Sequence, residues 1–99
     1  MNLNEQALYE VVLSNMADDY ESFEYLLEHV QQWASEKGVS VTRDVVAEAL
    51  GRSIRNGDAE AYILSPVPPH SQVVEFTIDR IDDLWFYVTP KGKQIVASS

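Results

Sequence analysis

The chain has 99 residues, a formal net charge of −9, 45% hydrophobic and 10% aromatic residues. This length predicts a single domain over residues 1–99, and this composition is typical of a folded globular protein. The absence of cysteine excludes disulfides, thiolate metal sites and a cysteine nucleophile within this chain, and no apolar run reaches the ~18 residues of a membrane helix.

Helical periodicity dominates the first half of the chain. A first helix is predicted from Asn4 to Met16, with Asn4 as its N-cap. A second is predicted over residues 21–36, where apolar residues recur at helical spacing for four turns, and Gly38 suits the left-handed position after it. Thr42 is a good N-cap for a third helix that ends at residues 56–58.

The period changes to that of strands after residue 58. Residues 61–64 predict a strand that Ser65 and Pro66 end, and the proline-rich residues 67–71 predict a loop because proline cannot donate to a sheet. Alternating apolar and polar residues over 74–79 predict a half-buried strand, and residues 84–89 predict a third. A short terminal helix is expected to follow, capped by Thr89 with Pro90 at its first position.

This order of elements resembles the winged-helix form of helix-turn-helix. The resemblance rests on residues 55–62, where a polar turn leads directly from the third helix into a strand, and on residues 87–93, Tyr-Val-Thr-Pro-Lys-Gly-Lys. The second segment is similar to the end of the wing in MarR-type and PadR-type regulators. The resemblance covers roughly residues 42–97, and it implies an α+β winged-helix fold that binds DNA through its third helix.

The charges of the third helix do not favour DNA binding. Its outward face carries Asp44, Glu48, Arg52 and Arg55, which sum to zero, and Glu48 and Arg52 have the spacing of a helical ion pair. Residues 65–79 contain no lysine or arginine to contact phosphates. Nucleic acid is therefore not the expected partner. If a dimer gathers its cations on one surface, the candidates for DNA contact are Arg43, Arg52 and Arg55.

No arrangement of residues indicates catalysis. The two histidines, His29 and His70, lie on different predicted elements, and no serine is marked as a nucleophile. Helical metal sites prefer more than one strong ligand, and His29 is the only histidine near the acidic residues of the second helix. The expectation is a protein that is not an enzyme and has no cofactor, no metal and no small-molecule substrate.

The acidity is concentrated in the first third of the chain. Residues 1–36 hold eight carboxylates and no lysine or arginine, a pattern that attracts basic partners, although solubility alone is the simpler interpretation. Tyr25 falls on the charged face of the second helix, where it is either an interface anchor or an ordinary exposed side chain. The proline-rich loop can act as a stiff arm toward a partner or a twin subunit. The candidate protein-binding residues are Tyr25, Glu21, Glu28, His29, Pro68 and Pro69.

The sequence thus predicts a small acidic winged-helix-like module that acts through protein contacts, with another protein or with a second copy of itself. Two alternatives stay open, a DNA-binding transcriptional regulator and an immunity-type or antitoxin-type inhibitor of a basic nuclease. The start of the chain lacks the basic flank and apolar stretch of a signal peptide, so we expect a cytoplasmic protein.

Overall fold

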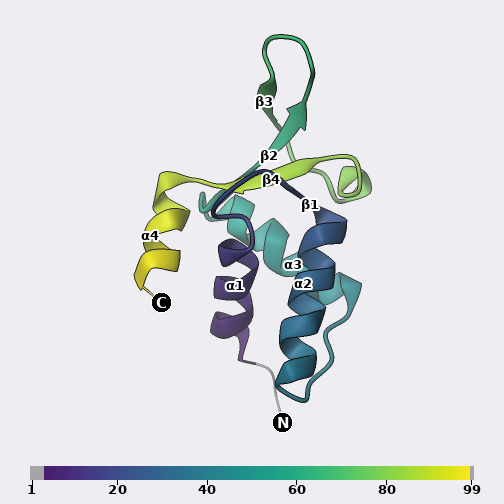
Figure 1. Ribbon diagram of the computed structural model, residues 1–99, viewed down its shortest axis with the longest axis vertical. Helices are drawn as coiled ribbons and strands as arrows, with labels where there is room; N and C mark the ends of the chain where they lie inside the picture. Colours follow the sequence, from purple (N-terminus) through teal and green to yellow (C-terminus); the bar gives the residue numbers. More distant parts are fainter. Residues whose placement is uncertain (1–3, 99) are drawn as a thin grey trace.

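The computed structural model describes residues 4–98, which form helices that lie against a four-stranded antiparallel sheet (Figure 1). In chain order the elements are α1 (Glu5–Ser14), β1 (Glu21–Ser22), α2 (Phe23–Glu36), α3 (Arg43–Arg55), β2 (Ala59–Leu64), β3 (Ser71–Val74), the 3₁₀ helix η1 (Ile78–Arg80), β4 (Trp85–Val88) and α4 (Pro90–Ser98). The predicted α+β class, with helices first and a short C-terminal helix in a winged-helix-like layout, is confirmed. None of the helices in residues 4–98 has the length and apolar character needed to cross a membrane.

Polar caps set the beginnings of the helices. Asn4, Thr42 and Thr89 each accept a hydrogen bond from a first-turn backbone amide, as predicted. Helix α2 differs, because its cap is Ser22, whose hydroxyl accepts a hydrogen bond from the backbone amide of Tyr25 at 3.2 Å. An N-cap residue needs extended backbone, and Ser22 has φ −76° and ψ 161°. Residues 21 and 22 are therefore available for sheet pairing instead of helix.

The strand order in the sheet is β1-β4-β2-β3. The predicted strand over residues 74–79 is wrong, because pairing begins at Ser71 opposite Leu64 and ends at Val74 opposite Ala61. Beyond this point the chain leaves the ladder and enters η1. The alternation of apolar and polar residues over 74–79 reflects side-chain packing and not strand pairing. Phe76 is half-buried, and its ring meets that of Phe86 edge-on, with centroids 5.9 Å apart.

The core lies between the helices and one face of the sheet. Its largest fully buried side chains include Phe23, Leu26, Leu50, Leu84 and Phe86. Alternate residues of β4 point to opposite faces, so Phe86 enters this core while its neighbours Trp85 and Tyr87 face the other way. The sheet therefore carries aromatic side chains on its outer face as well.

A tyrosine preceding β1 covers part of that outer face. The ring of Tyr20 meets those of Tyr62 and Tyr87 edge-on, at centroid distances of 4.9 and 5.1 Å. Its hydroxyl donates to Ser71 Oγ at 3.2 Å. Tyr20 thus reaches from the β1 side of the sheet across β4 and β2 to β3. This cluster could not be predicted from the sequence, because its members come from four separate segments.

Gly51 lies in the interior of α3 and is buried. A Cβ added at this position would lie 3.5 Å from a ring carbon of Phe76 and 3.4 Å from a guanidinium nitrogen of Arg55. Both distances are compatible with van der Waals contact after little or no adjustment, so the position tolerates a methyl group.

We expect Gly51→Ala to raise the free energy of unfolding by about 0.5–1 kcal/mol, because alanine is the better helix former in a helix interior. Gly38→Ala is the matched control. Gly38 has φ +77° with open space around it, so a methyl group there adds only backbone strain and should cost about 1 kcal/mol. Urea denaturation measures both. Destabilisation by Gly51→Ala would show that Phe76 cannot adjust.

Candidate protein-binding surfaces

A small hollow opens between the end of α1 and the start of α2. Its volume is about 280 Å³, and its lining consists of Ser14, Asn15, Asp18, Asp19, Glu21 and Tyr25. Half of these residues are carboxylates, and none is a lysine or arginine. The ion pairs within residues 4–98, Arg43–Asp82 and Lys91–Asp58, leave these carboxylates without a cation. We call this feature the acidic hollow.

Local hydrogen bonds shape the acidic hollow. Asn15 caps the end of α1, and its side-chain amide donates to the carbonyl of Val11 at 2.8 Å. The carboxylate of Asp19 accepts from the backbone amide of Tyr20 at 2.7 Å. Glu21 is held by strand pairing, because it lies opposite Phe86 in the β1–β4 ladder. These hydrogen bonds and the strand pairing therefore hold the turn between α1 and α2 in place in the free protein.

Tyr25 forms the exposed aromatic wall of the acidic hollow. Its side chain is 39% exposed, and its ring stacks on His29 with centroids 3.9 Å apart and planes at 29°. The Nδ1 atom of His29 lies 2.9 Å from the carbonyl oxygen of Tyr25. Of the sequence candidates, the structure brings Glu21, Tyr25 and His29 together, while Glu28 is exposed but does not line the hollow.

The surroundings of Glu21 and Tyr25 in the acidic hollow disfavour the ionised forms of these two side chains. Burial raises the pKa of Glu21, a hydrogen bond with Tyr25 partly offsets this effect, and the charge of Asp19 raises the pKa further. The pKa of Tyr25 is also raised, first by burial and then by the charge of Glu21. A cation placed in the hollow would favour the ionised form of Glu21 and relieve this repulsion.

Two of the three arginines proposed for DNA contact are engaged within the chain. Arg43 donates to the carboxylate of Asp82 at 2.6 Å. Arg52 lies over the ring of Tyr9, with its guanidinium carbon 5.6 Å from the centroid, and makes no ion pair with Glu48. The predicted Glu48–Arg52 pair is therefore wrong, because Arg52 turns toward α1. Only Arg55 is exposed without a hydrogen bond or ion pair to the residues that the structure describes.

The proline-rich loop between β2 and β3 forms the tip of a hairpin that projects beyond the helices (Figure 1). Pro68 and Pro69 are exposed, and neighbouring Val67 is 63% exposed. Neither proline lines the acidic hollow. The loop is therefore a second candidate surface, separate from the first.

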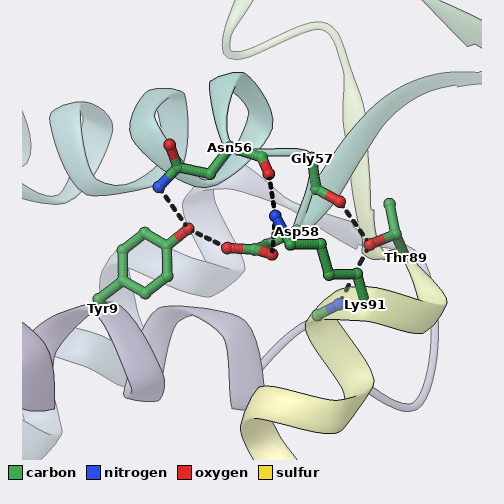
Figure 2. Close-up of polar contacts among 7 residues, drawn as sticks. Tyr9, Asn56, Gly57, Asp58, Thr89 and Lys91 are labelled. Carbon is green, nitrogen blue, oxygen red and sulfur yellow. Dashed lines mark hydrogen bonds and ion pairs between the residues drawn. The ribbon is translucent and has the colours of Figure 1, made fainter.

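A partly buried cluster of polar side chains, which the sequence did not predict, joins α1, the end of α3 and α4. Figure 2 shows Tyr9, Asn56, Asp58 and Lys91 converging, and we call them the polar clasp. Asp58 is only 3% exposed, and its Oδ2 accepts from the hydroxyl of Tyr9 at 2.5 Å. The side-chain amide of Asn56 donates to the same hydroxyl at 3.1 Å. Lys91 Nζ donates to the Asn56 carbonyl at 2.6 Å and lies 3.5 Å from Asp58 Oδ1.

The backbone completes the polar clasp. The amide of Thr89 donates to the carbonyl of Asp58 at 3.0 Å. The hydroxyl of Thr89 donates to the carbonyl of Gly57 at 2.7 Å, as Figure 2 shows. Gly92 packs against the same peptide, since a Cβ added there would fall 2.0 Å from the Asp58 carbonyl oxygen. Tyr9 and Asp58 are shielded from solvent, whereas Asn56 and Lys91 are exposed. The clasp fastens helices together, so we assign it a structural role.

The titratable side chains do not form a metal cluster in residues 4–98, where no three His, Cys, Asp or Glu residues could hold one ion. His29 contacts the carbonyl of Tyr25, and Nδ1 of His70 lies 3.2 Å from the carbonyl of Ser65. The two histidines thus make separate local contacts. Of the candidate sites, the acidic hollow combines charge, an exposed aromatic and a defined shape.

Comparison with known proteins gives no relative. The chain matches no protein-family model, no curated protein and no solved structure. The winged-helix family assignment therefore stays a prediction, and ideas about function rest on the geometry of the candidate surfaces.

Proposed function

We propose that the chain is a non-enzymatic, winged-helix-like interaction module that binds a basic protein through the acidic hollow. The observation that carries this proposal is the set of unneutralised carboxylates, Asp18, Asp19 and Glu21, beside the exposed ring of Tyr25. A lysine or arginine from the partner would place its charge among the carboxylates and its aliphatic stem against the ring. Aromatic anchors of this kind contribute strongly to protein interfaces.

The rest of the N-terminal third supports this mode of binding. Eight carboxylates precede Lys37 without an intervening cation, so their field attracts basic surfaces and repels nucleic acid and anionic lipid. Such steering speeds association and weakens as salt rises. We place the interaction in the cytoplasm, because a chain without cysteine suits a reducing compartment.

A capture experiment tests the proposal. The bait variants are wild type, the double variant Glu21→Lys/Tyr25→Ala, and Val45→Ala as a matched control, since Val45 is 41% exposed on α3 and lies outside the hollow. We expect one basic protein to be retained by wild type and Val45→Ala and lost by the double variant. Equal retention by all three baits would contradict a role for the acidic hollow.

Binding should also depend on pH. The raised pKa of Glu21 means that this carboxylate takes up a proton earlier than an ordinary glutamate as the pH falls. Affinity for an arginine-rich test peptide should therefore fall as the pH drops through that raised pKa, because the protonated form offers no charge. Glu21→Gln should bind more weakly at neutral pH and lose part of this dependence. Calorimetric titration measures both, and identical pH profiles would exclude Glu21 from the contact.

Duplex DNA should bind weakly. Arg43 and Arg52 are held by contacts inside the chain, which leaves Arg55 as the free cation of α3. Because phosphate contacts supply most non-specific affinity, we expect no retardation of random duplex in a gel shift at low salt. Salt-sensitive retardation that is lost in Arg55→Ala would favour the regulator alternative.

A further inference from the structure

The outer edge of the sheet is unpaired along β3. This strand is last in the order β1-β4-β2-β3, and it belongs to the hairpin that projects from the helices (Figure 1). The backbone amide of Ser65 donates to the carbonyl of His70 at 2.9 Å, so residues 65 and 70 form a hydrogen-bonded pair. Every second residue pair along the β2–β3 ladder from this point is then hydrogen-bonded as well. In an antiparallel ladder alternate residues point their backbone groups inward, so those of Gln72 face β2 and those of Ser71 and Val73 face outward.

This edge strand is short, at four residues, but it lacks other features that keep exposed strands apart. Proteins protect edge strands with charges, prolines or bulges within the strand. Residues 61–74 contain no Asp, Glu, Lys or Arg, in a chain whose net charge is −9, and no proline lies within β3 itself. The edge is therefore uncharged on a strongly acidic protein.

The most exposed large apolar side chains lie in β3 and in the segments just before and after it. Among the residues that the structure describes, they are Val67, Ile78 and Val73, with 63%, 57% and 53% exposure. Val73 and Ile78 also line a groove of about 830 Å³ between α3, the sheet and the start of α4. Its apolar lining includes Ile54 and Phe76. One strand laid along β3 would cover Val73 and lead into this groove.

We propose that the edge pairs with β3 of a second copy of this chain, in an antiparallel dimer centred on Val73. The outward backbone groups permit a two-fold axis at this residue, where Val73 would exchange hydrogen bonds with its own copy. In the same register, Gln72 of one copy lies opposite Val74 of the other, so the hairpin tip of each copy points toward the end of β3 and the start of η1 in the other. The proline-rich tip of the second copy would then lie over Ile78 and the groove, which gives Pro68 and Pro69 a function.

Electrostatics permits a second copy at this edge, and the groove beside it carries Arg55 together with Glu60 and Glu75. Two chains of −9 repel each other, so they associate best through a surface without charge. The acidic segments form α1, α2 and the turn between them, whereas the hairpin projects away from these helices (Figure 1). A pair of four-residue strands alone buries less than the roughly 1,000 Å² of a stable interface, so the groove contact is needed as well.

Sedimentation equilibrium on the full chain tests the dimer. Wild type is expected at twice the 11.2 kDa of one chain. Val73→Pro removes only an outward-facing amide, leaves the β2–β3 ladder intact, and should raise the dimer dissociation constant by about tenfold or more. Val73→Lys should act similarly, because it sets two like charges opposite each other. Val45→Lys, at an exposed valine of α3, is the control and should stay dimeric.

The outcomes separate this dimer from the proposed function. Raising salt should preserve or strengthen the dimer, because it screens the repulsion between acidic chains, whereas it should weaken binding of a basic partner. Glu21→Lys should leave the dimer intact. A monomeric wild type, or a dimer that survives both substitutions of Val73 in folded protein, overturns the edge-pairing proposal and leaves the acidic hollow untouched.

Discussion

Gly92→Ala is expected to lower the free energy of unfolding by about 2–3 kcal/mol, the cost of forcing a methyl group into a closely packed site. The added Cβ would lie 2.0 Å from the carbonyl oxygen of Asp58 and 3.0 Å from its carbonyl carbon. These are backbone atoms, so they cannot move aside as the end of a flexible side chain can. The start of α4 would have to shift away from Asp58, which would weaken the contacts that Thr89 and Lys91 make there.

Gly51→Ala is the matched control, because the same substitution in another buried helical glycine is expected to stabilise the protein. Hydrogen exchange should show the loss in Gly92→Ala concentrated in α4 and in the Thr89–Asp58 hydrogen bond. Wild-type stability with full protection of α4 would show that the helix does not pack as described.

Tyr9→Phe is expected to destabilise the protein by about 1.5–3 kcal/mol, the range for a hydrogen bond to a charged group. The substitution keeps the ring and removes the hydroxyl that donates to Asp58 Oδ2. A carboxylate that is 3% exposed would then lose its nearest donor and be left with Lys91, whose side chain is 65% exposed. Urea denaturation at neutral pH measures the loss.

The same variant should change the alkaline stability profile. Burial, and then the bond to Asp58, raise the pKa of Tyr9 above the ordinary value of 10.0. As the pH rises past that value, the unfolded chain releases the proton first, so the free energy of unfolding falls until the folded pKa is reached. In Tyr9→Phe the free energy of unfolding should fall less steeply as the pH rises. Part of the fall should remain in both proteins, because the pKa of Tyr62 is also raised. Parallel profiles would contradict a buried Tyr9–Asp58 bond.

Local signals made most of the helices predictable. Asn4, Thr42 and Thr89 cap the helices that the sequence assigned to them, because a cap depends on a few adjacent residues. Gly38 takes the positive φ expected at the end of α2. The exposure of Tyr25 also followed from periodicity alone, since the opposite face of α2 had to enter the core.

Features built from distant segments could not be predicted. The partner of Glu21 in the sheet is Phe86, and β1 is two residues long, so no alternation reveals it. Tyr9 and Asp58 are 49 positions apart, and the Asn-Gly-Asp turn indicated only the end of a helix. The residues of the acidic hollow are close in sequence, from Ser14 to Tyr25, but its shape depends on the pairing of β1 with β4, which the sequence does not reveal.

The placement of charge gives the molecule a preferred orientation on a solid support. The eight carboxylates before Lys37 lie in α1, α2 and the segment joining them, which includes β1. The hairpin, with no charge over residues 61–74, points away from these helices (Figure 1). On an anion-exchange bead or an amine-coated sensor chip, the helices would rest on the surface and the hairpin would face the liquid. Chips coated this way would hide one candidate surface while displaying the other, so oriented adsorption offers a means of assaying the two separately.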